Sequence, residues 1–84
     1  MDYIVDIKGK KVAYTDVGSG PVIVFIHGWS ESRMAFKNIS SVLSRKYRCI
    51  LIDLPGFGES DAIENVTLNK VSKKIEILLK KIGI

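Results

Sequence analysis

Several classes of protein are made improbable by what this sequence of 84 residues lacks. It has one cysteine, Cys49, so no disulfide forms within the chain, and a lone cysteine is typical of a reducing compartment. No apolar run is longer than one strand, and the first residues lack the basic and apolar regions of a signal peptide. We therefore expect a cytoplasmic protein without a transmembrane helix.

Metal ligands are also scarce. The chain has a single histidine, His27, and this residue and Cys49 fall on or next to different predicted strands. Structural zinc sites use four such ligands, so two separated residues do not make one. We expect neither a metal ion nor a cofactor.

The charge is unevenly distributed, with a net value of +4 and five lysines between positions 70 and 81. The simpler interpretation is the solvated face of a helix. The alternative is a surface for nucleic acid or an acidic membrane, but no aromatic residues alternate with these lysines and no nucleic-acid motif accompanies them. We therefore expect no nucleic-acid or membrane partner.

Apolar periodicity predicts a hairpin followed by a strand, a helix, a strand and a second helix. Residues alternate at strand period over 3–7 and 11–17, with a Gly-containing turn between them. Five consecutive apolar residues over 22–26 predict a strand buried on both faces. A nearly apolar run over 48–54 predicts a fourth strand, and the strand–helix–strand arrangement favours parallel pairing of the last two strands.

Two helices are expected. The first follows the serines at 30 and 32, ends near Arg45, and has an apolar face of Ala35, Phe36, Ile39, Val42 and Leu43. The second is capped by Thr67 and ends at Gly83. Its apolar stripe consists of Leu68, Val71, Ile75, Leu78, Leu79 and Ile82, which leaves Ile77 exposed among the lysines.

Two motifs follow the third and fourth strands, namely His27-Gly28-Trp29 and the segment Asp53-Leu-Pro-Gly-Phe-Gly-Glu-Ser60. Together, and in this strand–helix context, they resemble the N-terminal part of the α/β-hydrolase fold, in its branch of esterases and epoxide hydrolases. The resemblance covers essentially the whole chain. It implies an α/β fold with a β-hairpin followed by β-α-β-α, and a mixed sheet of about four strands in the order 1-2-4-3.

The resemblance also implies roles for the first motif. The backbone N–H of Trp29 would be one donor of an oxyanion hole, which stabilises the negative oxygen of a tetrahedral intermediate. His27 would orient the loop and is not the histidine of the catalytic triad. Gly28 would allow a tight turn under the substrate. The indole of Trp29 either lines the substrate pocket or packs as part of the structure, and the sequence leaves both open.

The second motif is expected to support the first. The resemblance implies that Asp53 and Ser60 form hydrogen bonds with backbone groups, and that Gly56 and Gly58 serve turns. We interpret all four as structural residues and not as catalytic ones.

The remaining catalytic residues do not occur in this sequence. The family's nucleophile lies in a Gly-x-Ser-x-Gly elbow after the strand that follows the second helix, and neither that motif nor a further histidine is present. A dyad of His27 with Ser30 or Ser60 is disfavoured, because neither serine lies on a strand-to-helix elbow. We therefore interpret residues 1–84 as a single partial domain, truncated before the nucleophile strand and inactive alone. The parent would hydrolyse an ester or related acyl bond of a small molecule.

A different class of function follows from the same argument. In the family, the strand over 22–26 has a further neighbour, and without it the strand would be an apolar edge of the kind that native proteins avoid. The alternative is a non-catalytic assembly or complementation module. Its partner would be a second copy of the chain or the remaining segment of the hydrolase.

Overall fold

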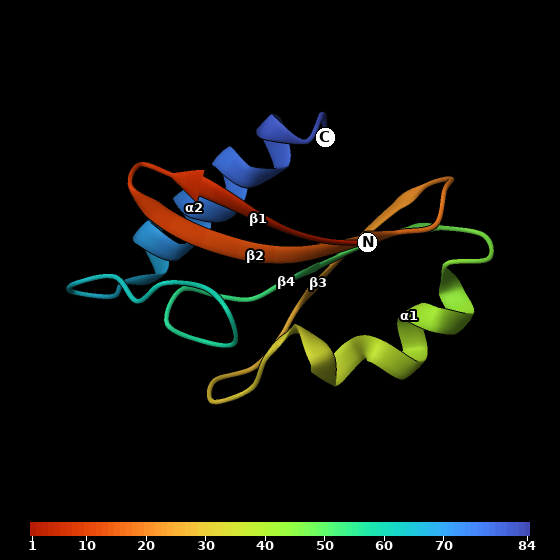
Figure 1. Cartoon of the computed structure of the whole chain (residues 1–84), viewed down its shortest axis with the longest axis horizontal. Helices are drawn as coiled ribbons and strands as arrows, with labels where there is room; N and C mark the ends of the chain where they lie inside the picture. Colours follow the sequence, from red (N-terminus) through yellow and green to blue (C-terminus); the bar gives the residue numbers. More distant parts are fainter.

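The computed structural model describes all 84 residues, which form a four-stranded mixed sheet with a helix on each face (Figure 1). The strands are β1 (Asp2–Ile7), β2 (Lys10–Val17), β3 (Val22–Ile26) and β4 (Arg48–Ile52). Their order is β1-β2-β4-β3, which confirms the expected arrangement. Strands β3 and β4 are parallel and the other neighbours are antiparallel, so the carboxyl ends of β3 and β4 lie at the same end of the sheet.

The hairpin of β1 and β2 has a two-residue turn. Ile7 pairs with Lys10, and the intervening Lys8 and Gly9 have φ angles of 52° and 83°. Two positive φ values identify a primed turn, whose twist matches that of the flanking strands. The short connection predicted from the glycine is therefore confirmed.

The core lies between the sheet and the second helix, α2 (Leu68–Lys81). Alternate residues of the strands point to this helix, as period-two side-chain geometry requires. The fully packed members are Ile7, Val12, Tyr14, Ile50, Ile52 and Leu78. Thr67 caps α2 as predicted, because its hydroxyl accepts a hydrogen bond from the Lys70 N–H at 3.2 Å.

Two predictions about α2 are wrong. Leu68 is exposed, because it occupies the first position of the helix, outside the cluster that packs against the sheet. Ile77 is half-buried and contacts the core, whereas the lysine-rich neighbourhood had suggested exposure. The helix contacts β1, and the packing against the core includes Ile77 as well as residues of the apolar stripe.

The first helical region differs from the single helix expected. A 3₁₀ turn, η1 (Arg33–Phe36), precedes a short α1 (Lys37–Leu43). Ser32 caps the 3₁₀ turn through a hydrogen bond from the Met34 N–H at 3.3 Å. Ile39 and Val42 are exposed and Ser40 is buried, so the predicted apolar face is wrong in part. Neither α1 nor α2 is long and apolar enough to cross a membrane.

Strand β4 ends at Ile52, two residues before the predicted end. The strand ends there because of the hydrogen-bond acceptors of the next two backbone N–H groups. The N–H of Asp53 still donates to the carbonyl oxygen of Ala13 at 3.0 Å, whereas the N–H of Leu54 donates to the His27 ring at 3.0 Å. A side chain thus replaces the sheet partner, and the chain leaves the strand there.

Strand β3 has one neighbour, β4, and forms an edge of the sheet. The expectation that this strand forms an apolar edge is confirmed, whereas its expected burial on both faces is wrong. Val22 and Ile26 are 39% and 44% exposed, and the three residues between them are half-buried. The five apolar residues of β3 are compatible with a central strand, but here one row of its backbone groups has no strand beside it.

Gly18 provides a test of the packing between the β2–β3 turn and the end of α1. A Cβ at Gly18 would overlap the Tyr47 carbonyl oxygen and lie 2.7 Å from that of Ser44, whereas a Cβ at Gly9 would meet nothing within 4 Å. Both residues have positive φ, so alanine at either position costs about 1–2 kcal/mol of backbone strain. We expect Gly18→Ala to cost about 1–3 kcal/mol more than Gly9→Ala, because of the added overlap. Urea unfolding of both variants measures this difference, and equal midpoints would contradict it.

Candidate functional site

The loops after β3 and β4 meet at the carboxyl end of the sheet, and His27 connects them. Its side chain is buried, and its Nε2 accepts the Leu54 N–H at 3.0 Å. Its Nδ1 lies 2.7 Å from the Gly28 carbonyl oxygen. Because Nε2 is an acceptor, the proton of the neutral ring is on Nδ1, which donates to that carbonyl. Both nitrogens are occupied, so the ring orients the loop and is not available as a general base.

Residues 28–31 form the turn that follows. The Gly28 carbonyl oxygen also accepts the Glu31 N–H at 3.2 Å, and the positive φ of this turn, 67°, falls on Ser30 and not on Gly28. A Cβ at Gly28 would lie 3.0 Å from the Glu31 carboxylate, so the glycine provides space there. The N–H of Trp29 donates no hydrogen bond within the chain.

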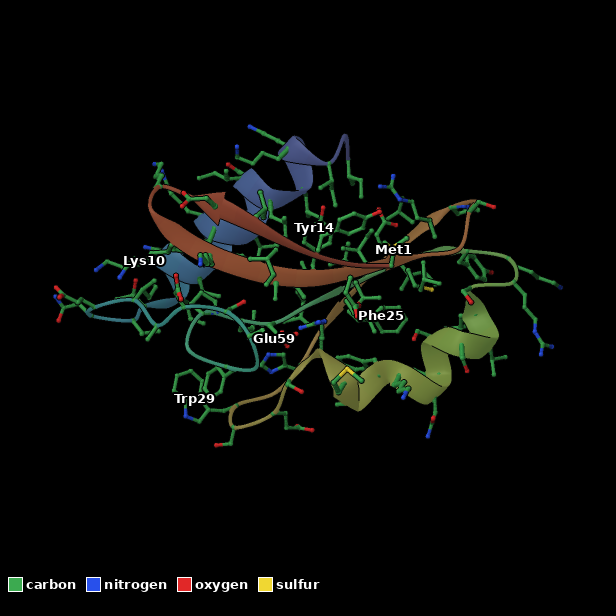
Figure 2. The ribbon with its side chains drawn as sticks, viewed as in Figure 1. Met1, Lys10, Tyr14, Phe25, Trp29 and Glu59 are labelled. Atoms are coloured by element: carbon green, nitrogen blue, oxygen red, sulfur yellow. The ribbon has the colours of Figure 1, made fainter.

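The Trp29 side chain is 71% exposed and lies beside the loop that follows β4 (Figure 2). Its ring meets that of Phe57 edge to face, with ring centroids 4.8 Å apart, and Phe57 also contacts His27 at 5.7 Å. Trp29 and Phe57 form one wall of a groove of about 460 Å³ that has no charged residue in its lining. The indole thus both lines this groove and packs against Phe57.

Asp53 is the centre of the loop that follows β4. Its side chain is fully buried, and its Oδ1 accepts the backbone N–H of Arg33 at 2.7 Å. Its Oδ2 accepts the Glu59 N–H at 2.9 Å and a further bond from Nη1 of Arg33. Gly58 lies against this carboxylate, where any Cβ would overlap it. The glycine is thus required by close approach as well as by its φ of 55°.

Arg33 is a site residue that sequence reasoning missed. Its guanidinium forms ion pairs with Asp53 and with Glu59, the latter at 2.9 Å, and its Nε donates to the Thr15 hydroxyl at 3.0 Å. Burial alone would lower the pKa of Arg33, but the Glu59 hydrogen bond and the Asp53 charge raise it above its ordinary value. The side chain therefore stays charged while it connects three segments. The one signal in the sequence is a lone arginine among the apolar residues that begin the first helix.

Ser60 and Asp61 attach the same loop to β2. The Ser60 hydroxyl donates to the Asp53 carbonyl oxygen at 2.7 Å and accepts the Ala13 N–H at 2.9 Å. Asp61 accepts the Lys11 N–H at 2.8 Å through its carboxylate. The Ser60 hydroxyl is buried and has two partners, so it is poorly placed to act as a nucleophile. Gly56 lies between Asp53 and Ser60 in the same loop, has a φ of 87°, and donates its N–H to the Asp61 carbonyl oxygen at 3.0 Å.

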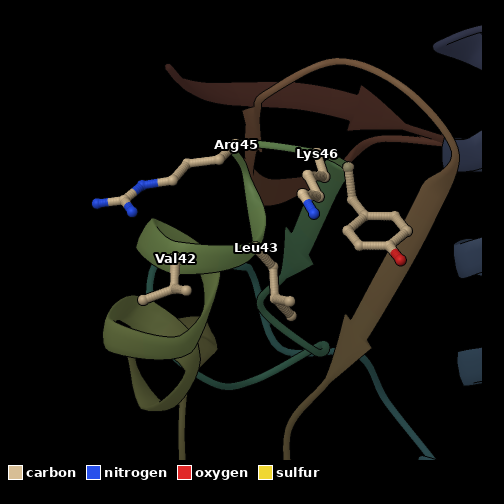
Figure 3. A pocket seen from close by; sticks show the side chains of 5 residues that line it. Val42, Leu43, Arg45 and Lys46 are labelled. Carbon is tan, nitrogen blue, oxygen red and sulfur yellow. The ribbon is translucent and has the colours of Figure 1, made fainter.

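A second hollow, of about 310 Å³, lies away from these loops (Figure 3). It is lined by the end of α1 and the segment before β4, including Leu43 and Tyr47. This segment leads into the amino end of β4, so the hollow lies at the opposite end of the sheet from His27. In open α/β sheets ligands bind at the carboxyl ends of strands, which favours the first groove. No group of three or more potential metal-binding side chains comes together anywhere in the chain.

Comparison with known proteins agrees with this architecture. A sequence model of the alpha/beta hydrolase fold matches residues 21–84. The chain belongs to the alpha/beta hydrolase family. Among curated members of the family, bifunctional epoxide hydrolase 2 of Sus scrofa is 29% identical over 86 residues, covering 98% of the chain and 16% of that protein. A pimeloyl-[acyl-carrier protein] methyl ester esterase of Wigglesworthia glossinidia brevipalpis is 37% identical over 60 residues, covering 70% and 23%.

A solved hydrolase gives the same result in three dimensions. The crystal structure of an epoxide hydrolase from Vigna radiata superposes on this chain with a TM-score of 0.91 and 30% sequence identity. The match covers all of this chain and 29% of that one. Residues 1–84 thus span less than a third of the length of these hydrolases and correspond to the N-terminal segment of their fold.

The Arg33–Asp53 pair can be tested by mutation. Removing one partner of a buried ion pair leaves an unpaired charge, so we expect Arg33→Met to cost about 3–5 kcal/mol of unfolding free energy. The half-exposed pair of Arg48 and Asp16 is a matched control, and Arg48→Met should cost much less. Urea unfolding compares them. Similar losses for the two arginines would contradict the role assigned to Arg33.

Proposed function

We propose that this chain supplies the oxyanion-stabilising segment of a hydrolase that cleaves an ester or a related bond. The reaction would proceed through a nucleophile, a histidine base and an acid, all located outside residues 1–84. Within the chain, the Trp29 N–H would donate to the oxygen that becomes negative in the transition state. His27, Gly28, Asp53, Gly56, Gly58 and Ser60 would hold the loop in position.

The observation that carries this proposal is the unused N–H of Trp29 on a loop that is otherwise held firmly. The loop is attached to the neighbouring loop by His27, and the chain just after it is attached through the backbone N–H of Arg33 to Asp53. A donor that is fixed before the reaction costs no reorganisation when negative charge develops, and one such donor contributes about 3–4 kcal/mol to catalysis.

The substrate class is proposed from the groove beside this donor. Its lining includes Trp29, Leu54, Phe57 and Val71, and the absence of charge there favours an uncharged, apolar group next to the reacting bond. The related proteins are named for epoxide and methyl ester hydrolysis, and both reactions act on uncharged groups. Cys49 is buried and unpaired, which supports a reducing compartment such as the cytoplasm.

The donor role can be tested in an assembled enzyme, obtained by combining residues 1–84 with a hydrolase segment that carries the nucleophile elbow. Trp29→Pro removes the N–H, and Trp29→Phe retains it with an aromatic ring. We expect Trp29→Pro to lower kcat by about a hundredfold to a thousandfold with a small change in KM, because the bond forms in the transition state. Trp29→Phe should keep most of the kcat.

Steady-state kinetics on an activated aryl ester measures both variants. An unchanged kcat for Trp29→Pro would exclude the donor role. The 84-residue chain by itself should hydrolyse the same ester no faster than buffer, since its one histidine has both ring nitrogens occupied.

A second candidate function is supported by the open edge of β3. In this alternative the chain is a non-catalytic assembly module that pairs with a strand of the remaining hydrolase segment or of a second copy. The supporting observation is that β3 is composed only of apolar residues, although it has a neighbouring strand on one side and none on the other. Such an edge readily accepts another strand.

The edge can be tested with a single lysine. We expect the chain to associate in a concentration-dependent way, and Val22→Lys should weaken this association because a charge on an edge strand opposes pairing. Val42→Lys is the control, since Val42 is also exposed but lies on α1. Sedimentation velocity over a range of concentrations measures the effect. A chain that remains monomeric at every concentration would exclude self-association.

A further inference from the structure

A hollow of about 280 Å³ between the β1–β2 turn and α2 gathers four lysines from two separate elements. Lys8 comes from the turn, and Lys70, Lys73 and Lys74 come from α2. Glu64 is the single acidic residue in the lining. Lys70, Lys73 and Lys74 are neighbours on one helix, whereas Lys8 is 62 positions before Lys70 in the sequence, so the tertiary structure brings Lys8 to this cluster.

None of these four ammonium groups forms an ion pair within the chain. The ion pairs of the chain involve Arg33, Arg48 and Lys80. Two of the four are instead held by backbone oxygens, since Lys70 donates to the Glu64 carbonyl at 3.1 Å and Lys74 to the Ile7 carbonyl at 3.2 Å. Two positive charges are thus positioned by the backbone without being neutralised.

The stability of α2 does not account for the lysine at position 70. Thr67 caps the helix, and Lys70 occupies the third helical position, where glutamate would complete a capping box. The first turn of α2 contains no acidic residue, so a cation there opposes the helix dipole. Within the chain, the Lys70 ammonium therefore has the Glu64 carbonyl oxygen as a partner but no carboxylate.

The location of the hollow is compatible with an exposed docking surface. It lies at the β1 edge of the sheet, and β3 forms the opposite edge. A strand that pairs with β3 therefore leaves it uncovered. Because β1 and β4 run in the same direction, the β1–β2 turn lies at the same end of the sheet as the Trp29 loop, as the positions of Lys10 and Trp29 in Figure 2 also show.

The chemistry of the hollow favours one kind of partner. It contains no arginine for bidentate phosphate binding and no aromatic side chain for base stacking, which disfavours nucleic acid. Its apolar residues, Ile63 and Ile77, are half-buried and do not project as a membrane anchor would. Dispersed ammonium groups with a small apolar floor complement a protein surface that presents carboxylates.

We propose that the four-lysine hollow is a docking site for a carboxylate-rich segment of a partner protein. The interaction places that partner at the end of the sheet that carries the Trp29 loop. It does not depend on the proposed catalytic function, because binding requires neither the Trp29 N–H nor a nucleophile.

The test uses the 84-residue chain and a helical peptide with glutamates at i, i+4 spacing, with its Gln-for-Glu analogue as the uncharged control. Titration calorimetry measures the Kd of both peptides. Lys70→Gln with Lys73→Gln removes two charges from the hollow, whereas Lys80→Gln with Lys81→Gln removes two charges from the other end of the same helix. We expect the first pair to weaken binding of the acidic peptide about tenfold or more and the second to change it little.

A third variant separates binding from stability. Lys70→Glu loses the exposed hydrogen bond to the Glu64 carbonyl but completes the capping box and places a negative charge in the first turn, so it should raise the melting temperature, and it should also abolish peptide binding. A loss of binding with a higher melting temperature cannot arise from unfolding, so this combination would support a direct contact.

Other outcomes would overturn the proposal. These are undetectable binding of the acidic peptide at low salt, equal binding of its uncharged analogue, or equal weakening by the two double variants. Tighter binding of a single-stranded oligonucleotide or of anionic phosphatidylserine vesicles than of the peptide would also overturn it and would assign the hollow to those ligands.

Discussion

The arrangement of the candidate site depends on one buried ion pair, between Arg33 and Asp53. Removing two charges from water is costly, and the cost is offset here because every oxygen of the Asp53 side chain accepts hydrogen bonds. Arg33 follows the Trp29 loop and Asp53 begins the loop after β4. The pair therefore fixes the distance between the two segments that carry the site, and Gly58 allows the carboxylate to fit between them.

The sheet then determines which surfaces face the site and which face solvent. Parallel pairing of β3 with β4 places His27 and Asp53 at one end, where His27 joins the two loops through the Leu54 N–H. The same topology leaves β3 at one edge and β1 at the other. One edge is a row of apolar residues, whereas lysines gather near the other. Each edge thus presents different chemistry.

The limits of sequence reasoning can be seen in particular residues. The hairpin, the parallel pair and the Thr67 cap were predictable because each depends on neighbours close in sequence or on a familiar order of motifs. Arg33 was not, because its partner is 20 positions away and an ion pair leaves no periodic pattern. Leu68 was predicted to be buried and Ile77 to be exposed, and both predictions were wrong for a related reason. Periodicity shows which side of a helix is apolar, but it does not show how far the sheet covers that side.

The sequence by itself determined the order of strands and helices, the Thr67 cap and the family, because these follow from local periodicity, capping and two motifs. Only the tertiary structure decided which groups remain free to act. It occupied both nitrogens of His27 and the hydroxyl of Ser60, and it left the Trp29 N–H unused. It also gathered lysines from the hairpin and α2 into one hollow. The physical reason is that hydrogen bonds and charge clusters form between residues distant in sequence, whose proximity exists only after the sheet has assembled.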